Sequence, residues 1–325
     1  MMRYLMRRLL YAVPILAGVN LLTFLLFFVV NSPNDMARFH LGFRRVTPAA
    51  VTQWKRDHGY NEPLLLNRKA QGLAVVTDTV FFRKSARLFW FQFGRSDDGR
   101  DIGLEIERRA GPSLAIAIPT FMIGLAVNIS LALFFVLFRS GMLDRGGQLV
   151  LVVMMSVSTL FYVIGGQFLF AETLRLVPIS GYASGVHALR FVVLPVLIGV
   201  LSGMGSGTRL YRSFFLEEIG KEYVRSARAR GLSEFAVLFR HVLPNGLVPI
   251  LTGAVAIIPS LFLGSLILES FFSIPGLGAY TLDAIQAQDF ATVRAMVFLG
   301  ALTNIIGYVL ADVSYTLVDP RIRLV

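Results

Sequence analysis

The sequence contains no cysteine, and only 16% of its 325 residues are charged. Without cysteine the chain forms no disulfide, has no thiolate nucleophile and offers no sulfur ligand to a metal ion. Soluble proteins carry about 25% charged residues, so this chain has too little charge to cover a water-exposed globular surface. The motifs G-x-x-x-x-G-K-[ST], G-x-S-x-G and H-E-x-x-H are also missing. We therefore expect no catalytic residue, no cofactor, no metal and no ATP site in the chain itself.

Hydrophobic residues make up 55% of the sequence and gather in long runs. A membrane-spanning helix needs about 20 mostly apolar residues, because lipid offers no partner to an unpaired backbone group. Six segments meet this requirement, namely 9–30, 112–138, 146–171, 191–208, 242–268 and 292–318. The expected fold class is therefore all-α, a polytopic membrane protein with six transmembrane helices.

The distribution of arginine predicts an orientation in the membrane. Arginines precede the first predicted span, lie between the second and third and between the fourth and fifth, and follow the sixth. Short loops rich in Lys and Arg stay in the cytoplasm, so both termini are predicted to be cytoplasmic. The net charge of +11 suits an anionic membrane surface better than nucleic acid, so the lipid bilayer is the expected partner.

This orientation divides the chain into four parts. Residues 1–30 form an N-terminal transmembrane helix; a cleaved signal peptide is disfavoured because the apolar run is too long and no A-x-A site follows. Residues 31–111 form an extracytoplasmic segment, within which 80–93 is typical of an interfacial helix or of a partly buried loop helix. Residues 112–318 form a five-helix core with a cytoplasmic hairpin at 211–244, and residues 319–325 form a cytoplasmic tail.

The segment 211–244 combines two amphipathic patterns that meet at Gly231, where a positive φ costs glycine little. Before Gly231 the glutamates come early and the arginines late, as the helix dipole favours. After it, Ser233 is placed to cap a second helix. The pattern predicts a short helical hairpin of the kind that inserts into a groove on a partner protein. From the residues alone, an amphipathic linker on the inner leaflet fits equally well.

The hairpin resembles the EAA loop of ABC importer permeases. That family's pattern is E-A-A, three residues, G, nine residues and I-x-L-P, and its spacing is kept here by 225–227 (RSA), Gly231 and 241–244 (HVLP). The local sequence is similar to the dipeptide, oligopeptide and nickel subfamily, in which the loop docks into the nucleotide-binding subunit. The resemblance implies an ATPase-coupling loop that includes Tyr223, Arg225, Ser226, Ala227, Arg228, Gly231, Leu232 and Pro244, with Ala227, Arg228, Gly231 and Leu232 at the contact.

Other motifs follow in the order of that subfamily. Residues 269–278 (ESFFSIPGLG) and 319–323 (DPRIR) are close matches. They supply the family-motif residues Pro275, Gly276, Gly278, Asp319, Pro320 and Arg321. Departures from the pattern, such as the missing proline after Ser158 and the long segment 31–111, leave the substrate open among dipeptides, longer peptides, nickel chelates and oligosaccharides.

The resemblance implies a type I ABC importer permease fold in a bacterial inner membrane. A chain of this family performs no chemistry and forms the translocation path for peptides or similar small solutes. The expected partners are a second homologous permease, two ABC ATPase subunits and an extracytoplasmic solute-binding protein. A homodimer of this chain is the alternative to the second permease, and no nucleic acid is expected.

Two other functions remain open. A stand-alone secondary transporter or channel requires ionisable residues at mid-membrane. Asp312 is the one such residue well inside a predicted span, with Arg321 or Arg323 as its expected partner. A membrane-anchored enzyme or sensor would use the segment 31–111, which has no nucleophile and base set. Polar residues in the spans have helix–helix hydrogen bonding as their commoner role, so no substrate contact is assigned.

Overall fold

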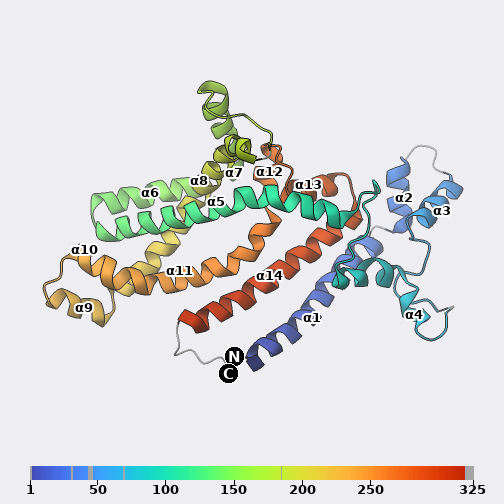
Figure 1. Cartoon of the computed structure of the whole chain (residues 1–325), viewed down its shortest axis with the longest axis horizontal. Coiled ribbons are helices and arrows are strands. Elements are labelled where there is room, and N and C mark those ends of the chain that lie inside the picture. The colour runs from blue at the N-terminus through green and yellow to red at the C-terminus, as the bar shows by residue number, and fades with distance from the viewer. Residues whose placement is uncertain (1, 31, 43–46, 69, 184, 319–325) are drawn as a thin grey trace. The chain divides into compact units, whose positions relative to one another are not determined.

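The computed structural model describes residues 2–30, 32–42, 47–68, 70–183 and 185–318. Within these ranges the chain is helical, and its only bridge between extended residues joins Arg95 and Asp101 (Figure 1). The expected all-α class is confirmed. The chain divides into two compact units, one made of Met1–Arg108 with Tyr280–Ile305 and the other of Arg109–Ala279 with Ile306–Leu324.

The first unit contains the N-terminal helix and the segment that follows it. Its elements are α1 (Met2–Leu25), η1 (Leu26–Val30), α2 (Pro33–Leu41), α3 (Pro48–Asp57), α4 (Ala74–Thr77), η2 (Phe81–Ser85), η3 (Ala86–Trp90), most of α13 (Leu277–Gln286) and the first parts of α5 (Ile102–Leu137) and α14 (Phe290–Val318). Helices α2 and α3 begin alike, because Ser32 and Thr47 cap them and a proline occupies the first helical position.

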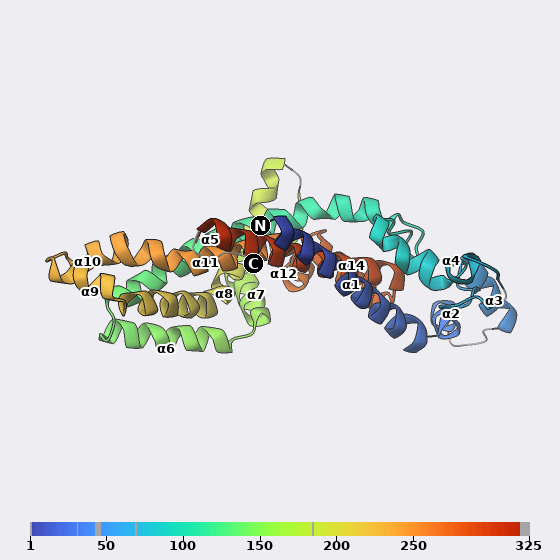
Figure 2. The same cartoon turned by 90° about the horizontal axis from the view of Figure 1, so that it is seen from below.

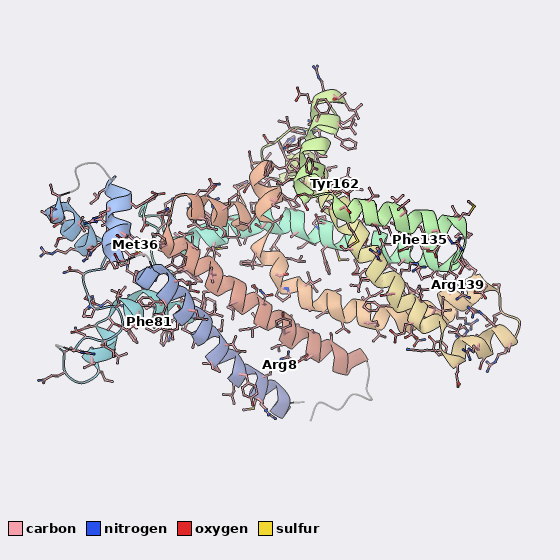
Figure 3. All side chains as sticks on the ribbon, turned by 180° about the vertical axis from the view of Figure 1, so that it is seen from behind. Arg8, Met36, Phe81, Phe135, Arg139 and Tyr162 are labelled. Atoms are coloured by element: carbon pink, nitrogen blue, oxygen red, sulfur yellow. The ribbon has the colours of Figure 1, made fainter. Side chains whose placement is uncertain are left out.

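Aromatic side chains hold this unit together. One buried cluster contains Phe24 of α1, Phe28 of η1, Met36 of α2, Phe290 of α14, and Tyr60 from the loop after α3. The ring of Phe81 meets the ring of Phe24 edge to face, with centroids 5.1 Å apart; Figure 3 labels Phe81 and Met36 on their separate elements. Full burial of such side chains contributes about 1.5–3 kcal/mol each, so the cluster packs the segment after α1 onto the helices of its own unit.

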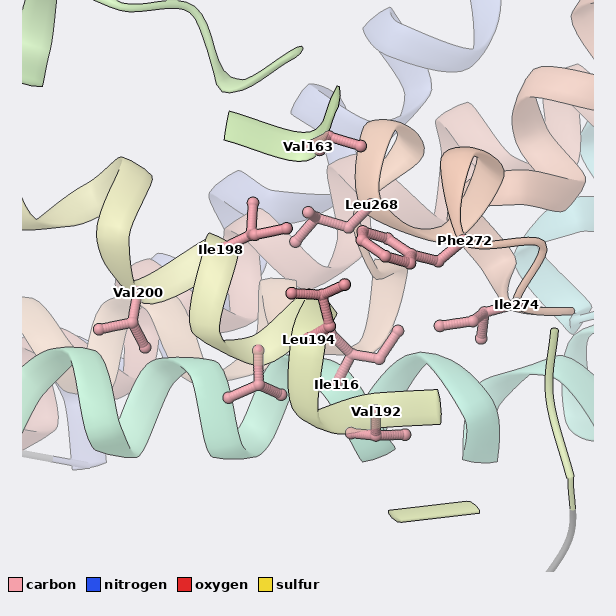
Figure 4. Close-up of a cluster of buried hydrophobic side chains, with 10 residues drawn as sticks. Ile116, Val163, Val192, Leu194, Ile198, Val200, Leu268, Phe272 and Ile274 are labelled. Carbon is pink, nitrogen blue, oxygen red and sulfur yellow. The ribbon is translucent and has the colours of Figure 1, made fainter. Parts of the chain in front are cut away.

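The second unit contains most of the apolar helices. Its elements are the rest of α5, then α6 (Met142–Ser156), α7 (Thr159–Gly166), η4 (Gln167–Thr173), η5 (Gly185–His187), α8 (Ala188–Ile219), α9 (Glu222–Ala229), α10 (Glu234–Val237), η6 (Leu238–Val242), α11 (Leu243–Ile257), η7 (Ile258–Leu263), α12 (Leu266–Phe271), the start of α13 (Leu277–Gln286) and the end of α14. Helix α6 packs against α8 and lies beside it in Figure 2. A buried cluster joins α5, α7, α8 and α12, and Figure 4 shows Leu194, Leu268 and Phe272 directed toward one another within it.

In the part of the chain that the structure describes, five helical segments are long and apolar enough to cross a membrane: Met6–Phe28, Ile102–Leu137, Ala188–Ile219, Glu234–Phe271 and Phe290–Ser314. A sixth span results if Met142–Ser156 and Thr159–Thr173 are counted together, although these two are bent by 91°. The structure is consistent with the six-span prediction, but the continuous helix expected over 146–171 is broken. Val157 is extended and the Ser158 hydroxyl accepts a hydrogen bond from the N–H of Leu160, which starts a new helix.

A side-chain hydrogen bond spans the break between α6 and α7. The hydroxyl of Tyr162 on α7, labelled in Figure 3, donates to the carbonyl of Met154 at 2.9 Å. The same carbonyl accepts a hydrogen bond from the N–H of Val157 at 3.3 Å, so the tyrosine adds a second bond at the end of α6. Tyr162 therefore helps α6 to end where it does.

Candidate functional site

A helical hairpin lies at the far end of α8 and α11, where α9 and α10 run side by side (Figures 1 and 2). Gly231 joins them with a φ of +78°, and Ser233 caps α10 by accepting a hydrogen bond from the N–H of Ala236 at 3.3 Å. The long helix α8 ends at Ile219, so the helical pattern before Gly231 is split into two helices. Lys221 is extended between them and becomes the N-cap of α9.

The hairpin has a hydrophobic interior. Val224 and Ala227 on α9 are buried against Val237 and Leu238, in one cluster with Ala132 on α5. Phe215 on α8 is fully buried in the same cluster. This packing ties the hairpin to α5 and α8, so the hairpin and the ends of these helices form one packed body.

Polar contacts close the hairpin at both ends. At its base, the carboxylate of Glu218 accepts hydrogen bonds from Lys221 Nζ and from the hydroxyl of Tyr223, the latter at 2.6 Å. Partial burial, together with this carboxylate, raises the pKa of Tyr223, so its hydroxyl stays a donor at physiological pH. At the turn, Arg228 donates to both carboxylate oxygens of Glu234, Nε at 2.7 Å and Nη2 at 3.2 Å. A bidentate pair of this kind fixes geometry as well as charge.

The structure distributes the expected coupling-loop residues over both faces of the hairpin. Arg225, Ser226, Gly231, Leu232 and Pro244 are exposed, and Arg228 and Tyr223 are half-buried. Ala227 is only 5% exposed and faces the interior. The side chain of Ala227 therefore supports the α9 surface from behind.

Two exposed aromatic residues complete the outer face. Phe235 and Phe239 are 60% and 42% exposed, and their ring centroids lie 4.3 Å apart. In the sequence they form one apolar stripe with Leu232, Leu238 and Val242. The structure divides this stripe, because Leu238 and Val242 pack inside the hairpin while the two phenylalanines remain outside. Periodicity places all of them on a helix but does not tell which side meets the core.

The family-motif residues surround a buried carboxylate that the sequence did not single out. Glu269 on α12 is 1% exposed; its Oε1 accepts from the N–H of Ser265 and its Oε2 from the N–H of Ala279, both at 3.0 Å. The hydroxyl of Ser113 on α5 also bonds this carboxylate and accepts from the N–H of Leu277 at 2.7 Å. Glu269 thus satisfies N–H groups at the starts of both α12 and α13, where helices leave donors unpaired.

The glycines of the motif make room for this carboxylate. A Cβ on Gly276 would lie 2.2 Å from Oε2 of Glu269, and a Cβ on Gly278 would lie 2.6 Å from the backbone of Ser265. Such distances exclude any side chain at either position. Pro275 lies in the same loop, whereas Asp319, Pro320 and Arg321, as well as the partners expected for Asp312, fall outside the described residues.

Like Glu269 in the second unit, Arg294 in the first unit is a charged residue that is buried within a helix. Arg294 on α14 is 4% exposed, and its guanidinium carbon lies 4.9 Å from the ring centre of Phe28. Its Nη1 donates to the Ser85 hydroxyl at 3.2 Å. Nearby, burial raises the pKa of Tyr60 to about 12, and burial together with the charge of Arg294 lowers the pKa of Lys84. Asp312 is therefore not alone as an ionisable residue inside a predicted span.

The second unit also contains a half-open cavity of about 460 Å³ between α5, α7, α8, η7 and α12. Hydroxyl groups line it, from Ser113, Thr120, Thr159, Ser202, Ser260 and Ser265. All six of these residues lie within the predicted spans. Asn128 instead accepts a hydrogen bond from Thr208 at 3.0 Å, which is the helix–helix role.

Comparison with known families places the chain in a class of transport protein. Residues 109–324 match the model of the binding-protein-dependent transport system inner membrane component, and residues 1–88 match the model of the N-terminal region of such membrane components. The chain belongs to this family of inner-membrane permeases.

Relatives with curated names cover the same length. The chain is 32% identical to a putative peptide transport system permease protein of Brucella abortus, over 98% of both chains. It is 28% identical to the dipeptide transport system permease protein of Bacillus subtilis, over 83% of this chain and 88% of the relative. It is 27% identical to an oligopeptide transport system permease protein of the same species, over 99% and 100% of the two chains.

Proposed function

We propose that this chain is the permease subunit of an ATP-driven importer and that its substrates are peptides or similar small solutes. The observation that carries the proposal is the hairpin 211–244, a packed element with an exposed basic and aromatic face, in a member of a binding-protein-dependent transport family. The peptide class is supported by the names of the relatives, which are peptide, dipeptide and oligopeptide permeases.

The proposed assembly contains a second homologous permease, two ABC ATPase subunits and an extracytoplasmic solute-binding protein. Both termini and the hairpin lie in the cytoplasm, and residues 31–111 lie outside. ATP binding moves the ATPase subunits, and these move the hairpin. Because the hairpin core includes Ala132 of α5 and Phe215 of α8, displacement of the hairpin also displaces these helices. The cavity would then open alternately to either side.

Within the hairpin the residues have different proposed roles. Arg225, Ser226 and Leu232 contact the ATPase subunit directly, and Phe235 with Phe239 supplies a compact apolar anchor of the kind that dominates interface energies. Tyr223 and Arg228 hold the hairpin in shape through Glu218 and Glu234. Ala227 packs beneath the contact surface, and Pro244 follows at the start of α11.

Replacing Gly231 with leucine tests the coupling role. A residue with a Cβ at φ +78° carries a strain of about 1–2 kcal/mol, although nothing lies within 4 Å of the added atom. We expect uptake and substrate-stimulated ATP hydrolysis to fall by roughly tenfold, since each 1.4 kcal/mol is a factor of ten. The amount of protein in the membrane should stay unchanged. The measurement is ATP hydrolysis and solute uptake by the assembled importer.

Gly146→Leu is the matched control. Gly146 is also exposed, has open space around it and lies in the helical region of α6, outside the hairpin. Leucine there should leave both activities near the wild-type level. Unchanged ATP-dependent uptake in the Gly231→Leu variant would contradict the coupling role of the hairpin.

A further inference from the structure

Two breaks in apolar helices border the same cavity. The first is the 91° bend between α6 and α7, after which Thr159 lines the cavity. The second lies in the segment Glu234–Phe271, where the 3-10 turn η7 leads to Gly264 at φ +69°. Ser260, Gly264 and Ser265 of this second break line the cavity from another direction.

Such breaks are informative inside a membrane. Non-helical backbone at membrane depth is tolerated only where protein buries it or where it lines a water-filled space. In transporters, discontinuous helices mark the place where the solute binds. The cavity of about 460 Å³ falls in the range of about 300–1,000 Å³ that holds small-molecule ligands.

The cavity wall shows which chemistry it suits. Among the described residues that line it, none is Lys or Arg, and Glu269 is the one carboxylate. The oxygens of that carboxylate are engaged by Ser265, Ala279 and Ser113, so the carboxylate holds helix ends and does not face a cation. What the wall offers is a set of neutral hydroxyl groups.

One hydroxyl on this wall lacks a partner within the described chain. The Oγ1 atom of Thr120 is buried and makes no hydrogen bond there. Ser202 and Ser260 donate to carbonyls of their own helices, at 3.1 Å and 2.7 Å, and keep lone pairs that can accept. A buried hydroxyl without a partner costs about 1–3 kcal/mol, and a ligand that bonds it removes this cost.

We propose that this cavity is a binding station on the translocation path, and that it takes uncharged hydrogen-bonding groups, as in the main-chain amides of a peptide. The charged ends of the peptide bind elsewhere. This inference rests on the proposed transport function and adds the location and chemistry of the path. Thr120 bonds the passing amide, and Ser202 faces it from α8.

The absence of cysteine from the chain makes the location testable. A single cysteine replaces Ser202. Leu197→Cys serves as the control, because Leu197 lies on the same helix as Ser202 but lines a separate apolar groove between α5 and α8. The reagent is a cationic, membrane-impermeant methanethiosulfonate, applied to the assembled importer in proteoliposomes. We expect the cysteine at 202 to react roughly tenfold faster than the cysteine at 197, because a thiol in apolar surroundings has a raised pKa and little reactive thiolate.

The chemistry is tested with radiolabelled tri-alanine as the transported peptide. Thr120→Val keeps the shape and removes the hydroxyl, and it should lower uptake of tri-alanine by roughly threefold to tenfold. Thr120→Ser should restore uptake. Modification of the Ser202→Cys variant by the reagent should block uptake of tri-alanine. Stimulated ATP hydrolysis depends separately on an intact Gly231.

Each outcome has a separate meaning. Equal reactivity at 202 and 197, or wild-type uptake by both Thr120→Val and the modified Ser202→Cys variant, overturns the cavity as a binding station while leaving the importer function in place. Loss of uptake in Thr120→Val without recovery in Thr120→Ser overturns the role of the hydroxyl. No ATP-dependent uptake of tri-alanine by the unmodified protein would instead contradict the peptide function itself.

Discussion

Asp144 on α6 holds the guanidinium of Arg212 on α8 through two hydrogen bonds, Nε to Oδ1 at 3.0 Å and Nη2 to Oδ2 at 2.7 Å. The exposed fractions of the two side chains are 7% and 20%. The sequence placed Arg212 in a cytoplasmic loop, where it counted only as a positive charge. In the structure α8 extends to Ile219, so Arg212 lies on a helix and joins it to α6.

Removing one member of this pair should destabilise the second unit strongly. In Arg212→Met the carboxylate of Asp144 stays buried without its counter-charge, which costs about 3–5 kcal/mol in fully buried pairs. Asp144→Leu should lower the melting temperature as well. The melting temperature of the double variant should fall by much less than the sum of the two single-variant losses, because the double variant buries no unpaired charge. The measurement is thermal unfolding of the purified protein in detergent, and additive losses would show that the pair carries no coupling.

Ionisation of Tyr60 should lower the stability of the first unit at alkaline pH. Burial raises its pKa to about 12 in the folded chain, above the ordinary value of 10. Between these values the unfolded chain releases the proton and the folded chain keeps it, so stability is full below pH 10 and falls as pH rises through 12. Melting temperatures at pH 9 and pH 11.5 should show a smaller alkaline drop in Tyr60→Phe than in the wild type. An equal drop in both would assign the loss of stability to other groups.

At the scale of the elements, Glu269 decides how α12 and α13 begin. Its oxygens accept from the first N–H groups of both helices, and Gly276 leaves it the necessary space. The motif 269–278 was identified from the sequence by resemblance, but its physical role depends on Ser113, which lies 164 positions before Leu277 in the chain. Contacts of that separation cannot be found from local spacing.

Glu269→Gln tests this role. Glutamine presents an NH₂ donor to backbone N–H groups that need an acceptor, so one buried donor is left unpaired at a cost of about 1–3 kcal/mol. We expect a clear loss of melting temperature, with Glu269→Ala losing more. Glu107→Gln, at an exposed carboxylate on α5, is the control and should melt like the wild type. Equal melting of Glu269→Gln and the control would show that Glu269 does not fix these helix starts.

The proposed function requires one orientation of the chain in the membrane, with the hairpin 211–244 on the cytoplasmic side. Arg56 on α3 and Arg225 on α9 are both exposed arginines, and they are predicted on opposite sides of the membrane. In spheroplasts, a membrane-impermeant maleimide should label Arg56→Cys without permeabilisation and Arg225→Cys only after it. The cysteine-free background makes each signal specific. Labelling of Arg225→Cys from outside would place the hairpin away from any cytoplasmic ATPase and would contradict the proposed coupling.

The sequence alone determined the all-α membrane class, the approximate spans and the hairpin that turns at Gly231. Lipid imposes its rules on each segment separately, in length and in polarity, and a turn with positive φ is a local property of glycine. The tertiary structure decided which side of the hairpin stripe is outside, where the third span breaks, which partner Arg212 finds and which hydroxyls share a cavity. Each of these depends on residues distant in the chain that packing brings together, and periodicity along one segment carries no information about the segment that will face it.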